Sequence, residues 1–378
     1  MSIFDRLRRK KTTQPKTRSK PGLIGLDLSS HHLHLCQLKP ESSNRFIITA
    51  KSTVALPGSR QQILKSPQEF KRLLAKATKG KNFKGNKVTA IMPPDDVKIL
   101  LLTYKASVND IDAEIIRMLK QRIDGNIDDY VIDYLPVRNN STDEEHIVMA
   151  SVAKRKKVEQ FLELLSFAGL QVDSLDIGPS ALRRLISVLY TDDKTSNVLL
   201  INTGEKTSYL TIVSGRRLLF DQPIKFGCKQ ILQEISASLD LPIEKVQQLV
   251  FQHGFSNSSS SGHNVGMITQ SEISATLLEI VKPAFLNLVE EINRVLIFTA
   301  SETHGIPLSR VYLLGCMARL PGAHELMLSL LDIAIPEFQT DFFDIFIDEN
   351  DETDSWSNQL PELAIATGLA LRGLQPDA

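Results

Sequence analysis

The feature that most constrains the fold is a segment that occurs twice: an apolar strand, a tight turn with an Asp or Asn, and a second alternating strand. The first copy begins with the apolar run Leu23 to Ser30, and the second begins with Leu200 to Gly204 and continues to Val213. Turns of this kind direct backbone N–H groups outward, where they can bind phosphate oxygens. A later buried strand ends at Gly315, where a backbone can pass close to a flat ligand. The sequence therefore predicts two phosphate-binding hairpins, followed later in the chain by a glycine turn.

Length and composition limit the class of protein. The chain has 378 residues, a length that corresponds to about two to three domains, and its hydrophobic content of 42% is enough for buried cores. Lys+Arg and Asp+Glu both number 44, so no net charge draws the chain to nucleic acid. Cys36, Cys228 and Cys316 form no CxxC pair, which argues for a reducing cytosol and against a disulfide framework. No apolar run reaches the roughly 18–20 residues of a membrane span, and no apolar stretch follows the basic start as in a signal peptide. We expect a soluble, cytoplasmic protein.

Two segments carry an uneven charge. Residues 1–20 hold eight basic side chains against the single acid Asp5. This tail is either a short helix in peripheral contact with an anionic membrane surface or a solvated, disordered segment. The acidic stretch at 348–356 contains the only Trp of the chain, Trp356. It is either a docking segment for a basic partner or a solvated loop.

Both halves of the chain follow one order: strand, turn, strand, strand and then helices, with an insertion in each half. The predicted divisions are a basic tail at 1–21, a first half at 22–93 and 169–195, an inserted subdomain at 94–168, and a second half at 196–373 with a helical insertion at 240–301.

Local signals predict the main helices at 67–78, 109–123, 155–168, 271–301 and 361–373. Asn109 is the expected N-cap of the second of these, Gly169 ends the third, and Pro283 is expected to kink the fourth. The tripeptide from Ser214 to Arg216 predicts a tight turn between two strands.

The two hairpins and the glycine turn, in this order and spacing, resemble the actin-like (ribonuclease H-like) α/β fold, a duplicated fold that binds nucleotide between its halves. The insertion at 94–168 lies where the division protein FtsA and the pilus protein PilM carry theirs. Three further parts of the chain resemble the PilM and MshI family: Phe167–Leu170 with Leu175 and Asp176, Ile201–Ser214 with Phe226–Cys228, and the closing segment Leu360–Arg372. The resemblance covers nearly the whole chain, residues 22–373.

This resemblance implies a cytoplasmic scaffold of a type IV, MSHA-like pilus assembly complex, peripheral to the inner membrane. It implies that the chain binds the cytoplasmic tail of a PilN/MshJ-like bitopic membrane protein between subdomains of its first half. It also implies a connection to the pilus motor ATPases, and binding of ATP and Mg²⁺ in the cleft between the halves.

The resemblance also assigns residues to the nucleotide site, with Asp27 facing the Mg²⁺. The implied nucleotide-binding residues are Asp27, Ser29, Ser30, Asn202, Thr203, Gly204, Gly227, Lys229, Gln230, Gly315, Cys316 and Met317. Several of these depart from the family pattern. Ser29 replaces a Gly and crowds the first turn. Asn202 replaces an Asp, and its neutral amide is a weaker Mg²⁺ ligand. Cys316 and Met317 replace glycines and put side chains where the base or ribose would lie. We therefore expect a degenerate ATP site with no catalytic residue, and weak ATPase activity at most.

Other interpretations of function remain open. The chain could be an active actin-like ATPase or nucleotide switch, or a GspL-like type II secretion component. Hydrolysis would need a residue that positions water. Asp176 lies at a suitable place in the chain order, but it equally fits the N-cap of the following helix, which we favour.

One further cluster has metal-ligating side chains. His32, His34 and Cys36 alternate along a predicted strand, so they share one face and form a candidate metal trio. Leu33 and Leu35 fill the opposite face, as in an ordinary half-buried strand, and we favour that interpretation.

Overall fold

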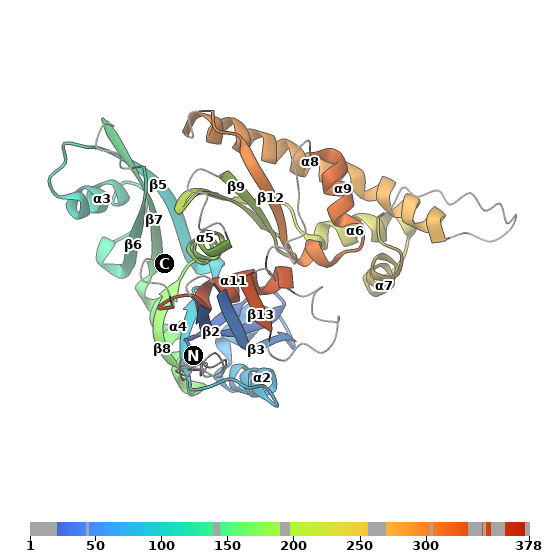
Figure 1. Cartoon of the computed structure of the whole chain (residues 1–378), viewed down its shortest axis with the longest axis horizontal. Helices are drawn as coiled ribbons and strands as arrows, with labels where there is room; N and C mark the ends of the chain where they lie inside the picture. Colours follow the sequence, from blue (N-terminus) through green and yellow to red (C-terminus); the bar gives the residue numbers. More distant parts are fainter. Residues whose placement is uncertain are drawn as a thin grey trace, which may run out of the picture.

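The computed structural model (Figure 1) describes residues 21–42, 45–138, 144–189, 197–255, 270–302, 305–331, 342, 345–348 and 360–374. The strands within these ranges form three sheets, of six, four and three strands. Residues 1–20 of the basic tail and most of the acidic stretch, including Trp356, lie outside the described residues.

The first sheet has the strand order β13-β3-β2-β1-β4-β8. Its strands are β1 (Ile24–Leu28), β2 (His32–Ser42), β3 (Arg45–Ala55), β4 (Lys87–Ile91), β8 (Gln171–Asp176) and β13 (Phe346–Asp348). Strands β1, β2 and β3 are antiparallel, whereas β4, β8 and β13 join by parallel pairing. Leu26 and Leu35 project from the face covered by α1 (Arg60–Lys65), α2 (Pro67–Thr78) and α4 (Arg155–Phe167). Because side chains alternate along a strand, the neighbouring positions Asp27 and His34 project from the other face.

The second sheet repeats the core of the first. It has the order β11-β10-β9-β12, with β9 (Asn197–Thr203), β10 (Ser208–Ser214) and β11 (Arg217–Ile224) antiparallel and β12 (Leu308–Gly315) parallel to β9. The first sheet contains the same arrangement as β3-β2-β1-β4. This equivalence confirms the predicted duplication.

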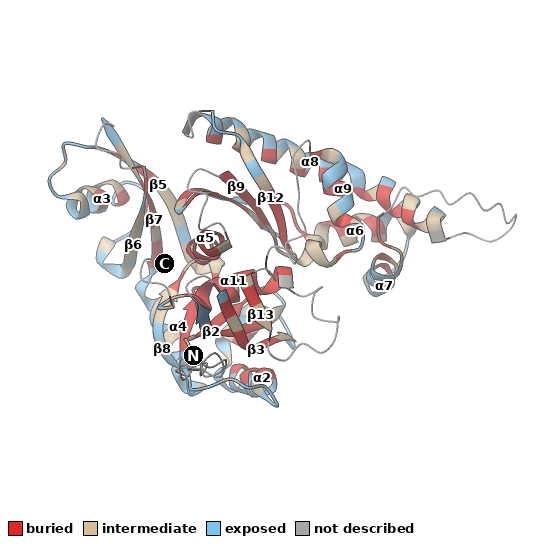
Figure 2. Cartoon of the chain, viewed as in Figure 1, coloured by how far each residue is buried: buried red, intermediate tan, exposed pale blue. Residues whose placement is uncertain are grey.

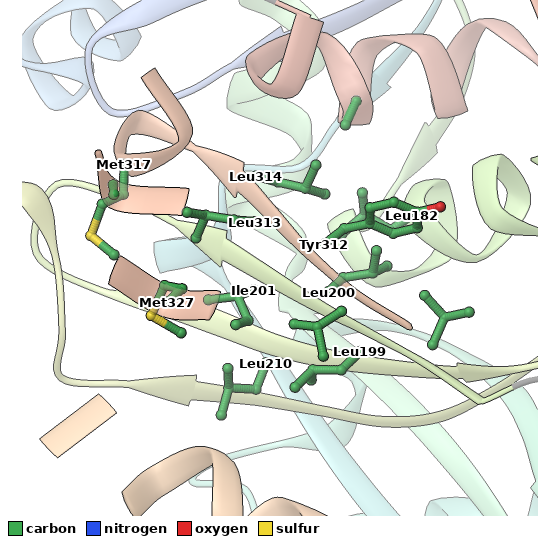
Figure 3. Close-up of a cluster of buried hydrophobic side chains, with 14 of the residues drawn as sticks. Leu182, Leu199, Leu200, Ile201, Leu210, Tyr312, Leu313, Leu314, Met317 and Met327 are labelled. Atoms are coloured by element: carbon green, nitrogen blue, oxygen red, sulfur yellow. The ribbon is translucent and has the colours of Figure 1, made fainter. Parts of the chain in front are cut away.

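The core of the second half is continuous through its sheet. Leu199, Leu200 and Ile201 of β9 are fully buried and lie against Leu313 of β12 and Leu210 of β10 (Figure 3). An uninterrupted apolar run is typical of a strand that is buried on both faces. Each such Leu or Ile contributes about 1.5–3 kcal/mol of hydrophobic free energy. The covering helices are α6 (Cys228–Leu239), α7 (Ile243–His253), α8 (Gln270–Glu302) and α9 (Ala323–Leu330).

The inserted subdomain is a three-stranded antiparallel sheet of order β5-β7-β6. Its elements are η2 (Pro94–Asp96), β5 (Val97–Lys105), α3 (Ile111–Leu119), η3 (Ile127–Asp129), β6 (Tyr130–Arg138) and β7 (Glu145–Lys154). Leu102, Ile115 and Leu119 pack into a separate small core between α3 and this sheet. The chain leaves the insertion through α4.

Two helices lie between the halves, α5 (Gly178–Leu189) and α11 (Leu360–Ala370) (Figure 1). A helix that is apolar on all sides has to be buried, and α11 is buried along most of its length (Figure 2). It contacts β1, β2 and β4 of the first sheet as well as β12 of the second. A Cβ on Gly25 would lie 1.9 Å from the Ala366 carbonyl oxygen, and one on Gly368 would lie 2.1 Å from that of Ala181. The backbones of β1, α11 and α5 are therefore in direct contact.

Most predicted elements are present within a few residues of their expected bounds. Gly169 follows α4 with a positive φ of 90°, and Gly215 occupies the β10–β11 turn. The N-cap of α3 is Asp110 and not Asn109, because the Asp110 carboxylate accepts the Ala113 N–H at 3.0 Å. Helix α8 runs through Pro283 as one element. None of the described helices is both long enough and apolar enough to cross a membrane.

The end of the chain differs from the predicted division. The sequence analysis assigns residues 196–373 to the second half, but β13 pairs with β3 and α11 packs on β1 and β2. The reason is that α11 is apolar all round and needs neighbours on every side. The remaining boundaries stay a prediction.

Candidate functional site

The turn of the first hairpin is closed by Ser29. Its N–H donates to the His32 carbonyl oxygen at 2.9 Å, and its hydroxyl donates to the same oxygen at 3.0 Å. The hydroxyl also accepts the His32 N–H at 3.1 Å. Ser29 is thus used within the turn itself, while Ser30 follows it, half-buried.

Asp27 lies just before this turn and is 5% exposed. Burial raises the pKa of its carboxyl group to about 7; the Arg60 guanidinium opposes this rise and the Glu362 carboxylate adds to it. The residue predicted to face Mg²⁺ is therefore present, but it is covered on the face that α11 occupies.

In the second hairpin, Thr203 and Gly204 bind other parts of the protein. The Thr203 hydroxyl donates to the Leu314 carbonyl oxygen at 2.7 Å and accepts the Met317 N–H at 2.9 Å. The Gly204 N–H donates to the Ser208 hydroxyl at 3.3 Å. Asn202 is half-buried at the end of β9. Thr203 therefore fixes the turn after β12, whereas the sequence analysis expected it to contact phosphate.

The N-terminus of α6 is occupied by the same hairpin. The N–H groups of Cys228 and Lys229 donate to the carbonyl oxygens of Gly204 and Glu205, at 3.1 and 2.9 Å. A Cβ on Gly227 would lie 2.3 Å from the Glu205 carbonyl oxygen, so the backbones are in close contact. Gln230 donates to Glu234 of its own helix at 2.9 Å. Lys229 and Gln230, which the sequence analysis placed beside the nucleotide, are therefore hydrogen-bonded within the protein.

The glycine turn after β12 also contacts this hairpin. Gly315 has a φ of 79°, and a Cβ there would lie 2.1 Å from the Thr203 carbonyl oxygen. Met317 is fully buried in the core of the second half (Figure 3). The Cys316 sulfur lies 3.1 Å from the Gly204 carbonyl oxygen.

A disulfide joins Cys316 to Cys228, with a Cα–Cα distance of 6.6 Å across 88 residues of sequence. The expectation from cysteine spacing was wrong for this pair. The cysteines are distant in sequence, but β12 and α6 bring them together beside Gly204. Cys36 is free and buried, and burial raises the pKa of its thiol to about 12.

The turns of the two hairpins meet. The His31 Nε2 lies 2.9 Å from a Glu205 carboxylate oxygen, and the Lys229 ammonium lies 3.9 Å from the other oxygen of Glu205. We call His31, Gly204, Glu205, Cys228 and Cys316 the hairpin junction. The hairpin junction brings together the first hairpin, the second hairpin and the glycine turn after β12. The Glu205 carboxylate lies between the two hairpin turns, where the sequence analysis expected a phosphate.

Asp176 forms an ion pair in place of the predicted helix cap. Its Oδ2 accepts from Arg184 of α5 at 2.7 Å and from Arg372 at 3.1 Å, and its Oδ1 accepts the N–H of the adjacent Ile177 at 2.8 Å. Arg184 also donates to the Gly368 carbonyl oxygen at 2.8 Å. Asp176 therefore ties β8 to α5 and α11, which is a structural role.

The three residues of the candidate metal trio on β2 lie in two different environments. His32 and His34 lie near Glu362 of α11, whereas the Cys36 sulfur accepts from the Thr367 hydroxyl at 3.6 Å in the core. Burial lowers the pKa of His32 to about 4 and of His34 to about 3, with the Arg319 charge contributing to both shifts. Both rings are neutral at pH 7.

Sequence reasoning did not identify Glu362, Glu205 or His31 as site residues. A signal was present for two of them. Glu362 is an isolated acid in an apolar helix, and Glu205 follows directly on the turn glycine Gly204.

This protein has the actin-like α/β fold. The features that define this class are two equivalent sheets, two hairpin turns that meet between them, and a helix that packs against both sheets. The chain belongs to the type IV pilus assembly protein PilM family, whose model matches residues 25–263, more than half of its length.

Two solved structures show the same fold. One is the PilM–PilN type IV pilus biogenesis complex, with 20% sequence identity, coverage of 94% of this chain and 99% of that chain, and a TM-score of 0.72. The other is the ethanolamine utilization protein EutJ from Carboxydothermus hydrogenoformans, with 13% identity, coverage of 94% and 90%, and a TM-score of 0.50.

Proposed function

We propose that this chain is a cytoplasmic scaffold of a type IV, MSHA-like pilus assembly complex at the inner membrane. It binds the cytoplasmic tail of a PilN/MshJ-like membrane protein and connects that protein to the pilus motor ATPases. The observation that carries the proposal is membership of the PilM family. The similar solved structure is a complex that pairs a PilM with a PilN.

The proposed position of the tail is the base of the inserted subdomain, beside α4. Two ion pairs support this base: Asp95 of η2 with Arg60 at 2.6 Å, and Asp96 with Lys157 of α4 at 3.3 Å. Val131, at the start of β6, is 38% exposed. An exposed apolar side chain is a suitable anchor for a short peptide.

The second part of the proposal is that the nucleotide position is degenerate. The Glu205 carboxylate at the hairpin junction would repel phosphate oxygens. The Cys228–Cys316 disulfide crosses from the α6 N-terminus to the glycine turn, over the hairpin that would hold the nucleotide. Weak or absent ATP binding is the expected result, and ATP with Mg²⁺ enters only if this junction opens.

Two parallel calorimetric titrations of the purified chain test the proposal. One uses a synthetic N-terminal peptide of the candidate PilN-like partner, and the other uses Mg·ATP. We expect the peptide to bind and the nucleotide to bind weakly or not at all. Val131→Asp should weaken peptide binding at least about tenfold. The matched control is Leu328→Asp, at a 40% exposed site on α9, and it should leave binding unchanged.

Each outcome decides one part of the proposal. Failure of the peptide to bind would refute the scaffold function. Micromolar binding of Mg·ATP to the disulfide-bonded chain would refute the degenerate site and favour a nucleotide switch. If ATP binds only after Cys228→Ser/Cys316→Ser or Glu205→Ala, the hairpin junction is what excludes it.

A further inference from the structure

Three side chains from two distant segments converge on the face of the first sheet that α11 covers. His32 and His34 are two residues apart on β2, so both rings project from the same face, and their ring centroids are 5.6 Å apart. Glu362 brings a carboxylate from the first turn of α11. One potential ligand atom from each of the three lies within 4.8 Å of the other two. We call these residues the histidine cluster; its donors surround a position that one cation can share.

A contact with β3 occupies one nitrogen of the His34 ring and leaves the other available to a metal. Its Nδ1 lies 3.1 Å from the hydroxyl of Thr53, the residue opposite it on β3. When Nδ1 donates to this hydroxyl, the lone pair remains on Nε2, and such a bond to the second ring nitrogen is the usual support of a histidine ligand. His34 is 3% exposed and Glu362 is 9% exposed. Little solvent therefore competes for these donors.

The types of donor select the class of cation. Two imidazole nitrogens and one carboxylate suit Zn²⁺ and Co²⁺, whereas Mg²⁺ and Ca²⁺ prefer all-oxygen sites. Three protein ligands leave a fourth tetrahedral position for water. The structure assigns a zinc-class transition-metal site to the histidine cluster. This site lies beside the Mg²⁺ position expected at Asp27, which is paired with His34 across the sheet, but it uses other ligands. The assignment does not depend on the proposed pilus function.

Arg319 is the group that opposes a cation here. Its Nη1 donates to a Glu362 carboxylate oxygen at 3.1 Å, and its guanidinium carbon lies 5.8 Å from the centroid of the Phe251 ring. A bound metal would share the Glu362 carboxylate with Arg319 or displace the guanidinium toward Phe251. Removing the positive charge of Arg319 should therefore increase metal affinity, because the guanidinium and a metal cation bound to the same carboxylate repel each other.

The test is a titration of the full chain, first freed of metal by a chelator, with Zn²⁺ alone and with Co²⁺ alone. We expect one saturable Zn²⁺ site per chain and visible Co²⁺ absorption bands of a tetrahedral site. His32→Gln and Glu362→Gln should each weaken Zn²⁺ binding at least about tenfold. Arg319→Gln should strengthen it by about fivefold or more. His32 is partly exposed, so H32Q is the variant whose fold is least at risk, and circular dichroism verifies that fold.

Two controls separate this site from other ligands nearby. His31→Gln changes the adjacent histidine outside the cluster, and Cys228→Ser/Cys316→Ser removes the thiols that reduction would expose; both should keep wild-type Zn²⁺ affinity. Absence of saturable Zn²⁺ binding would overturn the assignment. So would binding that survives H32Q and E362Q, or binding that is lost in the double serine variant.

Discussion

Replacing Asp176 by Asn tests whether this residue is structural, as its contacts indicate. The side chains of Asp176 and Arg184 are 6% and 2% exposed, and their charged atoms are 2.7 Å apart. Removing one partner of a buried ion pair costs about 3–5 kcal/mol, because the other charge stays buried without compensation. Arg184 retains the Gly368 carbonyl oxygen as an acceptor, so we expect a loss near the lower limit, about 3 kcal/mol of unfolding free energy.

The assay is urea unfolding of the whole chain, followed by circular dichroism. The matched control is Asp173→Asn, an exposed acid on the same strand, whose replacement should change stability by less than about 0.5 kcal/mol. The paired replacement Asp176→Leu/Arg184→Met should recover much of the loss, since an apolar pair of similar volume can replace a buried ion pair. If D176N and D173N have the same free energy of unfolding, the ion pair contributes little and the structural interpretation is refuted.

Two further predictions concern stability. Burial raises the pKa of Asp221 to about 7, and its Oδ2 is buried without a hydrogen-bond partner. The folded state therefore favours the protonated acid: this contribution is complete below about pH 4 and is lost as pH rises through about 7. Urea unfolding should show the wild type losing stability between about pH 4 and 7, with Asp221 contributing at most about 4 kcal/mol. Asp221→Asn should show a shallower slope and keep the part due to Asp27, whose pKa burial also raises to about 7; equal slopes would disprove it. Gly25→Ala should lower the free energy of unfolding by about 1–3 kcal/mol, because α11 has to move away from β1. Gly178→Ala, whose Cβ would meet its nearest atom at 3.5 Å, is the control, and an equal effect of both changes would contradict the close packing of β1 on α11.

The elements that sequence reasoning predicted well are those with a local cause. The apolar run of β9 requires burial on both faces wherever it lies in the fold. The serine-capped helix α2 has its bounds at Pro67 and Thr78, the predicted ones, because Ser66 and Pro67 define its start locally. The two hairpins were also predicted from local alternation.

The site was harder to predict, because its determining contacts join distant parts of the chain. The Thr203 hydroxyl bonds to Leu314, 111 residues away, and the Cys228–Cys316 disulfide spans 88 residues. The Glu205–His31 contact depends on how the two halves approach each other. Residue type alone indicated that Cys316 departs from the family pattern, but not which groups would take the place of a ligand.

The position of α11 has a consequence for how the chain is made. Thr367 bonds to Cys36 across 331 residues of sequence, and the edge strand β13 also comes from the end of the described chain. During synthesis the first strands, β1 to β3, leave the ribosome with the Gly25 and His34 face uncovered, and this face stays uncovered until the residues of α11, 360–370, have been translated. At about 5–20 residues per second, this interval lasts for tens of seconds. A chaperone or a membrane partner that recognises that face would therefore meet it on the nascent chain, before α11 covers it.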